Sequence, residues 1–507
     1  MKRKKKFSFP TAYTVILAVM LIVLLLTYVI PSGKYSTLSY VMEGGKFVVE
    51  DPFGGQVELE GTQKTLDELG IKINIGMFKD ESITKPVAIP GSYKGIEKEN
   101  KSIINGIVSF FKAPVEGLYD SIDIITFVLV IGGIVGVVNK SGAFTAGINS
   151  LSKILKGKEK WLIVLIIILI GIGGTTFGLA EEIIAFYPIV IPVFLASGYD
   201  ALVAIAAVYL GSAMGSMAST VNPFATVIAS NTAGINFTDG IFVRISLLVL
   251  GLLTCIIYVI RYAEKVKKDP SKSLIYSQKE EIDKQYLISS KEDTPKFTFG
   301  RKAMLIIFVL SFGIMIYGVK ELGWWFQEMT ALFLGVTFIM YLFAGLKEKE
   351  FVNEFVVGAS DLLGVALIIG LARGVTIIME KGMISDTILF YLSKGISGMS
   401  GVVFSTVIFF VYIILGFFIA SSSGLAVLSI PIMAPLADIV GVNRDIIVSA
   451  YEFGQGLMGF ITPTGLILAS LAMVNITYDK WLKFILPLMI MIGVLAIVVL
   501  GFGVIVG

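Results

Sequence analysis

The sequence predicts an all-α polytopic membrane protein in which two inverted repeats each contain a re-entrant hairpin and a broken transmembrane helix. The prediction rests on composition, on a repeated segment, and on Gly and Pro interruptions at matching places. Of the 507 residues, 55% are apolar and 16% are charged, and the mean hydropathy is +0.86. A soluble protein cannot bury this much apolar surface. Several apolar runs also reach the ~20 residues that a helix needs to cross a bilayer.

A repeated segment is the second observation. Polar, Gly and Pro residues of the first half recur in the second half at a nearly constant spacing. The matched positions are Asp120 with Asp361, Gly142 with Gly382, Pro188 with Pro431, Pro192 with Pro435, and Pro223 with Pro463. In an apolar chain, a repeat that carries Gly and Pro breaks is typical of a secondary transporter, because paired broken helices form a site near the bilayer midplane.

The first transmembrane helix is expected within residues 1–31. A basic run at positions 2–6 precedes it, so the positive-inside rule places the N-terminus in the cytoplasm. We interpret this helix as retained rather than as a cleaved signal peptide, because no small-residue cleavage site follows Pro31. Residues 32–104 then form an extracytoplasmic loop, and parts of 47–59 could form a small hairpin.

The remainder of the chain is expected to divide into two repeats joined by a cytoplasmic loop and two linking helices. The expected segments are repeat 1 at 105–260 with its hairpin at 161–198 and its broken helix at 201–235, the cytoplasmic loop at 261–302, the linking helices at 303–346, and repeat 2 at 347–507 with its hairpin at 402–438 and its broken helix at 444–474. An odd number of crossings places the C-terminus outside. The second repeat starts from the opposite side to the first, so the repeats are predicted to be inverted.

Four polar interruptions lie within otherwise apolar segments and form the candidate site for solute and ion. Each break frees backbone carbonyls at one half-helix end and N–H groups at the other, so the first can bind a cation and the second a carboxylate. The alternative is that Ser, Thr and Gly only allow helices to approach closely. The breaks near Asn222 and Thr462 are candidate sodium sites, and Glu452 and Gln455 are weaker candidates for the solute. The candidate residues are Thr175, Thr176, Gly178, Ser219, Thr220, Asn222, Ser421, Ser422, Ser423, Gly424, Thr462 and Thr464.

Three charged residues inside apolar segments are further candidates. Glu181 and Glu182 lie in a stretch without a basic residue between Lys160 and Arg244, and acids within a membrane are costly and usually functional. They are expected to face a coupling ion, a proton or a cationic group of the solute; the alternative is a protonated side chain bonded to a neighbouring helix. Arg373 suits bidentate binding of a carboxylate, or it is a fixed counter-ion for one of the two glutamates.

The composition and the motifs exclude several classes of protein. The chain has one cysteine, Cys255, and no histidine, which excludes disulfides, cysteine metal clusters and His-ligated metals. The sequence contains no Walker loop, dinucleotide fingerprint or hydrolase elbow. We therefore expect no enzymatic activity, no bound cofactor and no nucleic-acid partner, with sodium or a proton as the coupling ion.

Four motifs span the interruptions: FGLAEE at 177–182, SSSG at 421–424, PIMAPLAD at 431–438 and ITPT at 461–464. Together they resemble the YfcC-type branch of the anaerobic dicarboxylate carrier family, within the ion transporter superfamily. The resemblance implies a scaffold domain, a transport domain of two hairpins and two broken helices, elevator-like movement and usually a homodimer. It also implies transport of dicarboxylates or exchange of basic amino acids of the arginine and ornithine kind.

The chain departs from the family pattern near the second hairpin and the last break. Relatives often carry Gln where Leu425 stands, and an Asp and an Asn near Gln455 and Gly459, so selectivity or coupling could differ. We expect a secondary active transporter of a small charged organic solute in the cell membrane, with a basic amino acid favoured over a dicarboxylate because of Glu181 and Glu182. A passive ion channel is the alternative from another class of protein, which the paired inverted hairpins disfavour.

Overall fold

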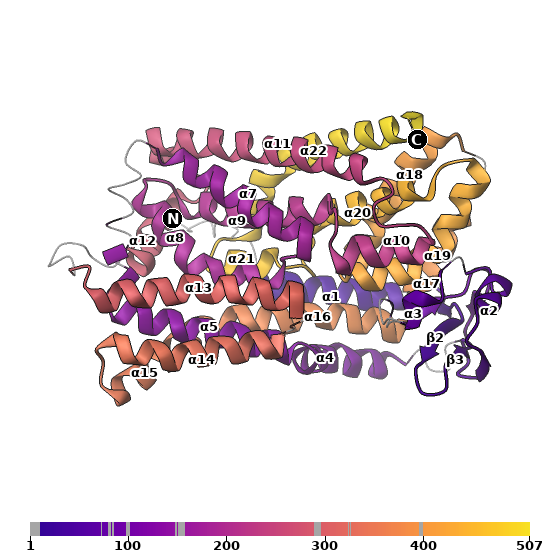
Figure 1. The fold of residues 1–507 in the computed structure, drawn as a ribbon, viewed down its shortest axis with the longest axis horizontal. Helices are drawn as coiled ribbons and strands as arrows, with labels where there is room; N and C mark the ends of the chain where they lie inside the picture. The colour runs from indigo at the N-terminus through magenta and orange to yellow at the C-terminus, as the bar shows by residue number, and fades with distance from the viewer. Residues whose placement is uncertain are drawn as a thin grey trace, which may run out of the picture.

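The computed structural model describes residues 11–71, 73–79, 83, 86–97, 102–144, 146–147, 150, 158–287, 296–322, 324, 326–394 and 399–506. Over these ranges the chain forms a long bundle of helices with a small β-sheet unit at one end (Figure 1). The helices that are long and apolar enough to cross a membrane, among the described residues, are Ile122–Lys140, Ile241–Lys268, Phe326–Ala344, Leu363–Gly382, Gly401–Phe418 and Tyr478–Val506. The predicted helical, polytopic membrane architecture is confirmed.

The β-sheet unit lies within residues 33–95. Its elements are β1 (Gly33–Lys34), β2 (Thr37–Val41), β3 (Lys46–Glu50), β4 (Gln56–Glu60), α2 (Gln63–Glu68), α3 (Gly76–Lys79), β5 (Val87–Ala88) and β6 (Lys94–Gly95). Strands β4, β3, β2 and β5 form an antiparallel sheet in that order, and β1 pairs with β6. Leu38, Phe47, Leu66 and Val87 form its separate apolar core. The sequence indicated only a hairpin here, because β5 pairs with β2 across a long stretch of chain.

Two pairs of helices pack closely through glycine. They are α4 (Ile103–Asp120) and α5 (Ile122–Lys140) in the first half of the chain, and α15 (Glu348–Asp361) and α16 (Leu363–Gly382) in the second half. Helix α4 packs against α16, and α5 packs against α15. A Cβ added at Gly132 would lie 2.5 Å from the carbonyl oxygen of Gly358. Glycine at this position therefore lets the two backbones approach.

Two further sets of elements, one in each half of the chain, form much of the bundle. The first set is α7 (Lys160–Phe177), η1 (Glu181–Phe186), α8 (Tyr187–Ala196), α9 (Ala201–Met217), η2 (Pro223–Val227), α10 (Ile228–Ala233) and α11 (Ile241–Lys268). The second set is α18 (Gly401–Phe418), α19 (Ser422–Val440), α20 (Arg444–Gly459), α21 (Ile467–Ala472) and α22 (Tyr478–Val506). Helix α7 packs against α9 as α18 packs against α20.

Helices α9 and α20 enter the middle of the bundle from opposite ends. Asp200, which caps α9, accepts a hydrogen bond of 2.8 Å from the hydroxyl of Tyr262, near the end of α11. Asp445, in the first turn of α20, lies against Gly240 at the start of α11. The two helices contact each other between these ends, so an interrupted helix reaches the centre from each side (Figure 1).

The remaining helices are α1 (Ala12–Val29), α12 (Lys279–Tyr286), α13 (Phe299–Leu322), α14 (Phe326–Ala344) and α17 (Ser385–Lys394). Helix α11 continues to Lys268, past the end of its apolar run. Lys265, Lys267 and Lys268 lie in its last turn, where positive charge is favourable beside the carbonyl end of a helix. Part of the expected cytoplasmic loop is therefore helical.

Candidate functional site

The first helix break lies between α9 and η2. Helix α9 ends at Met217, and Pro223 cannot bond back to it because proline has no backbone N–H. Asn222 caps the following turn, since its Oδ1 accepts a hydrogen bond of 2.8 Å from the N–H of Phe224. Asn222 is 3% exposed. The break therefore holds a buried amide side chain among freed backbone groups.

The tip of the first hairpin is bonded to this break. Helix α7 stops because Gly178 takes the left-handed conformation, with φ of 73°. Thr175 Oγ1 donates to the carbonyl of Ala218 (3.2 Å) and accepts from the N–H of Thr220 (3.0 Å). A Cβ at Gly178 would lie 2.8 Å from the amide of Asn222. These contacts bring two of the four predicted interruptions together.

The tip of the second hairpin also touches the first break. Ser421 Oγ accepts from the N–H of Gly424 (3.2 Å) and caps the start of α19. Ser422 Oγ donates to the carbonyl of Phe224 (3.3 Å), in the turn that follows the first break. Ser423 lies in the same first turn of α19. A third predicted interruption therefore converges on the first break.

The second helix break, between α20 and α21, is held differently. The carbonyls freed after α20 accept hydrogen bonds from aromatic side chains of α9 and α22. The bonds run from Tyr209 to Gly459 (2.6 Å), from Trp481 to Phe460 (2.9 Å) and from Tyr478 to Ile461. Thr462 and Thr464 bond to each other, with 2.9 Å between their hydroxyl oxygens. Each of these carbonyls accepts one hydrogen bond in this conformation, and the sodium site expected near Thr462 stays a prediction.

Glu181 and Glu182 lie in η1, next to the first hairpin tip. The Oε2 of Glu182 accepts from the N–H of Ala180 (3.0 Å), so this carboxylate is bonded within its own turn. Glu181 has Asp123 of α5 as its charged neighbour. Among the described residues, neither glutamate has a Lys or Arg within ion-pair distance. The acidic side chains between η1 and α5 therefore have no basic partner among the described residues.

Two predicted site residues are engaged elsewhere. Thr176 Oγ1 donates to the carbonyl of Ile172 (2.6 Å), within its own helix. Arg373, on α16, forms an ion pair through its Nε with Asp120 of α4, and its side chain is 37% exposed. The counter-ion of Arg373 in this conformation is therefore Asp120 rather than either glutamate of η1.

A buried ion pair lies behind the first break. The side chains of Arg244, on α11, and Glu452, on α20, are both 0% exposed, with 4.0 Å between Nε and Oε2. Glu452 Oε1 accepts from Thr226 (2.5 Å), whose hydroxyl is bonded to that of Ser219 (2.5 Å). The sequence suggested Glu452 only weakly and Arg244 not at all. The sequence feature that could have identified Arg244 is its position as a basic residue in the first turn of an apolar helix.

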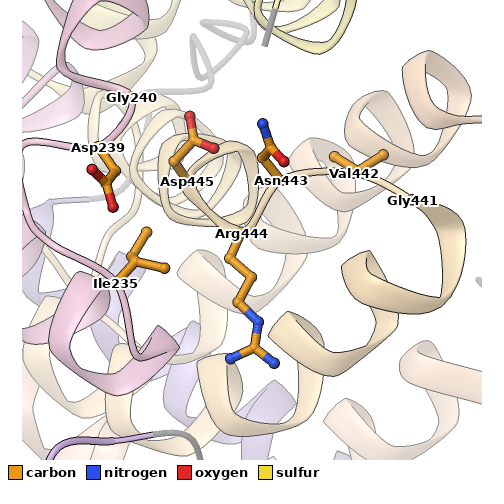
Figure 2. A pocket seen from close by; sticks show the side chains of 8 residues that line it. All are labelled: Ile235, Asp239, Gly240, Gly441, Val442, Asn443, Arg444 and Asp445. Atoms are coloured by element: carbon orange, nitrogen blue, oxygen red, sulfur yellow. The ribbon is translucent and has the colours of Figure 1, made fainter.

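An open pocket of about 700 Å³ lies where α10 leads into α11 and α19 leads into α20. Its lining includes Asp239, Gly240, Arg444 and Asp445 (Figure 2). The carboxylates of Asp239 and Asp445 lie on one side, and the guanidinium of Arg444 extends away from them (Figure 2) to donate to the carbonyl of Ala233 (2.7 Å). The pocket lies outside the predicted interruptions, at the end of the bundle that carries the C-terminus (Figure 1).

Two solved structures align with nearly the whole chain but at low similarity. MtrF of Neisseria gonorrhoeae, from a study of antimetabolite efflux pumps, is 16% identical over 98% of this chain and 96% of its own, with a TM-score of 0.39. The YdaH transporter of Alcanivorax borkumensis is 13% identical over 97% of this chain and 99% of its own, with a TM-score of 0.38. Similarity at this level carries no argument about this molecule.

Sequence relatives are more informative. A Haemophilus influenzae protein without an assigned function is 47% identical over 502 residues, which is 98% of each chain. YfcC of Escherichia coli, named as a candidate basic amino acid antiporter, is 29% identical over 501 residues, 95% of this chain and 94% of its own. The model of the C4-dicarboxylate anaerobic carrier family matches residues 9–505. The chain therefore belongs to this family of membrane transporters, as its motifs predicted.

Proposed function

We propose that this protein is a secondary active transporter that carries a small cationic organic solute, a basic amino acid, by alternating access. The observation that carries the proposal is the pair of acidic side chains on η1, whose negative charge when ionised has no basic partner among the described residues. Glu181, Glu182 and Asp123 are neighbours, and among the described residues no basic side chain pairs with the two glutamates. A cationic group on the solute would offset this charge, and such an attraction is worth ~4 kcal/mol at 4 Å for an effective dielectric of 20.

The α-carboxylate of an amino acid would have a separate partner in the start of α19. This helix begins at Ser422 and extends to Val440, and the N–H groups of a helix's first turn attract anions. The hydroxyls of Ser421, Ser422 and Ser423 lie at the same place. The name of the Escherichia coli relative supports the same class of solute.

A dicarboxylate is the second candidate solute, and the description of the family favours it. It would need positive charge at the site. Arg373 is the candidate donor, but its guanidinium is paired with Asp120. A dicarboxylate would therefore have to displace an aspartate to bind there.

Arginine and succinate uptake into proteoliposomes tests the proposal, with a sodium series and a pH series to identify the coupling ion. We expect saturable arginine uptake and counterflow, which a passive channel would not give. Glu181→Gln or Glu182→Gln should weaken arginine binding at least about tenfold, which corresponds to ~1.4 kcal/mol. Glu380→Gln, at an exposed acid outside the site, is the matched control. Saturable succinate uptake without arginine uptake, lost in Arg373→Gln, would replace this proposal with the dicarboxylate carrier.

We further propose an elevator-like homodimer with the N-terminus in the cytoplasm and the C-terminus outside. Cysteines introduced at Thr65 in α2 and at Ser277 in the loop after α11 report the two sides. Cys255 is buried, so its background reaction with a membrane-impermeant reagent should be small. We expect labelling from opposite sides; labelling from the same side would contradict the inverted arrangement.

A further inference from the structure

A chain of hydroxyls connects the buried ion pair to the first helix break. Ser219 lies in the break and Thr226 lies in η2, and both are fully buried. Their oxygens are 2.5 Å apart, and Thr226 is also 2.5 Å from Glu452 Oε1. We call Ser219, Thr226 and Glu452 the hydroxyl chain. It runs from α20 directly to the break that the two hairpin tips contact.

The hydrogen atoms of this chain can point in only one direction at a time. A hydroxyl has one hydrogen, so when Thr226 donates to an ionised Glu452 it must accept from Ser219. The Ser219 oxygen then offers only lone pairs to the break, which suits a cation. If Glu452 is protonated, Oε1 donates to Thr226, Thr226 donates to Ser219, and the hydrogen of Ser219 turns toward the break.

The pairing of Glu452 with Arg244 is loose enough to permit both states. The 4.0 Å contact leaves Arg244 Nε, Arg244 Nη1 and Glu452 Oε2 without hydrogen-bond partners. A buried ion pair is stabilising only when its remaining hydrogen-bonding groups are satisfied. Arg244 also faces Oε2, so an added proton is placed on Oε1, the oxygen at the end of the hydroxyl chain.

Among the described residues, Arg244 is the basic partner of Glu452, and Asp445 on the same helix also interacts with Arg244. Tyr451, next to Glu452 in the chain, donates to the carbonyl of Ser422 (2.7 Å). Helices α9, α10, α18, α19 and α22 also pack against α20. The titratable groups that they place against it are Tyr209, bonded to Gly459, and Tyr412, which packs on Tyr451 and bonds to Ser429.

The open pocket lies near this buried pair but is not lined by it. Asp445 lines the pocket and lies two helical turns before Glu452 on α20. Gly240 also lines it, and its carbonyl accepts from the backbone N–H of Arg244 (3.2 Å). The pocket therefore brings solvent to within about two helical turns of Glu452, at the end of the bundle that carries the C-terminus.

We propose that Glu452 is a proton-binding residue of the transporter, and that its protonation reverses the hydroxyl chain and lowers the affinity of the first break for a cationic solute. This inference rests on the proposed function. Because binding coupling is reciprocal, the solute also displaces the proton. Solute and proton therefore exchange in opposite directions, and Thr226 is the positioning residue between them.

Binding of labelled arginine to the purified full-length protein across a pH series tests the inference. The dissociation constant of the wild type should rise as pH falls, by up to about tenfold per pH unit for one displaced proton. Thr226→Val interrupts the hydroxyl chain and leaves the charges of Arg244 and Glu452 in place, whereas Thr226→Ser keeps the hydroxyl. Thr232→Val, which removes a hydroxyl bonded only within α10, is the matched control.

Glu181 and Glu182 would titrate in every variant, so the decisive quantity is the difference between variants. Calorimetry in two buffers of different ionisation enthalpy counts the protons released when arginine binds. We expect about one fewer proton from Thr226→Val than from the wild type, Thr226→Ser and Thr232→Val, because one site is uncoupled. Equal proton release by all four proteins would overturn the inference while leaving arginine transport intact.

The same experiments distinguish a wrong solute in the proposed function from a failure of the inference about the hydroxyl chain. If the wild type binds succinate and not arginine, the proposed solute is wrong. The hydroxyl chain then predicts the opposite pH dependence of affinity. Succinate should bind more tightly at lower pH, and Thr226→Val should remove this dependence. Identical succinate profiles in the two proteins would overturn the inference as well.

Discussion

The first and second helix breaks satisfy their freed backbone groups with different kinds of side chain. At the first break, the partners are short and polar: Thr175 and Ser422 from the two hairpin tips, and Asn222 within the break. At the second break, the partners are the large, rigid side chains of Tyr209, Trp481 and Tyr478. The two breaks therefore have different surroundings.

This difference indicates a division of roles. Small hydroxyl and amide groups can exchange one partner for an ion, a solute group or water at low cost, because the alternative hydrogen bonds are similar in strength. Aromatic side chains buried in a packed core cannot move without losing many contacts. Trp481 is 0% exposed. We infer that the first break is the adaptable part of the site and that the second break is a fixed support.

Gly178→Ala should have the largest effect. Its φ of 73° costs an alanine about 1–2 kcal/mol, and the added Cβ would press on the amide of Asn222. We expect loss of most uptake with folded protein still in the membrane. Gly459→Ala is the control at the second break, because no atom lies within 4 Å of a Cβ added there. Equal loss in both variants would remove the distinction between the breaks.

Tyr209→Phe should separate stability from binding at the second break. It removes only the hydroxyl that donates to Gly459, and an unsatisfied buried acceptor costs about 1–3 kcal/mol. We expect a lower melting temperature with an unchanged affinity for the solute. Tyr258→Phe removes a similar bond, to Phe484, outside both breaks. Weakened solute binding in Tyr209→Phe alone would show that the second break also contributes to the site.

The sequence predicted the class of fold, because it depends on local patterns. Apolar runs define the helices, and Gly178 and Pro223 stop helices wherever they occur in such runs. In the structure, α7 ends at Phe177 and α19 begins at Ser422, beside the two polar tips. Whether these residues bind the solute remains a prediction, since geometry alone does not identify a ligand.

The acidic partner of each arginine could not be predicted, because it depends on which helices pack together in the folded chain. The pairs Arg373 with Asp120 and Arg244 with Glu452 join residues more than a hundred positions apart, on different helices. No local pattern distinguishes a substrate-binding arginine from one that is already neutralised. The β-sheet unit was underestimated for the same reason, since strands β2 and β5 pair across a long loop.

The smallest effect is expected for Thr464→Val at the second break. Its hydroxyl lies 2.9 Å from that of Thr462, and the nearby carbonyls have aromatic donors, so the variant loses one hydroxyl–hydroxyl bond of about 0.5–1.5 kcal/mol. Uptake should stay within about threefold of wild type, measured with and without sodium. A cost of ~1.4 kcal/mol would reduce affinity about tenfold if all of it weakened binding, and we expect only part of the lost bond energy to affect binding. Thr464→Ser, which keeps the hydroxyl, should match the wild type. A large loss that appears only in sodium would instead assign the ion to the second break, and the two breaks would then share the transport site.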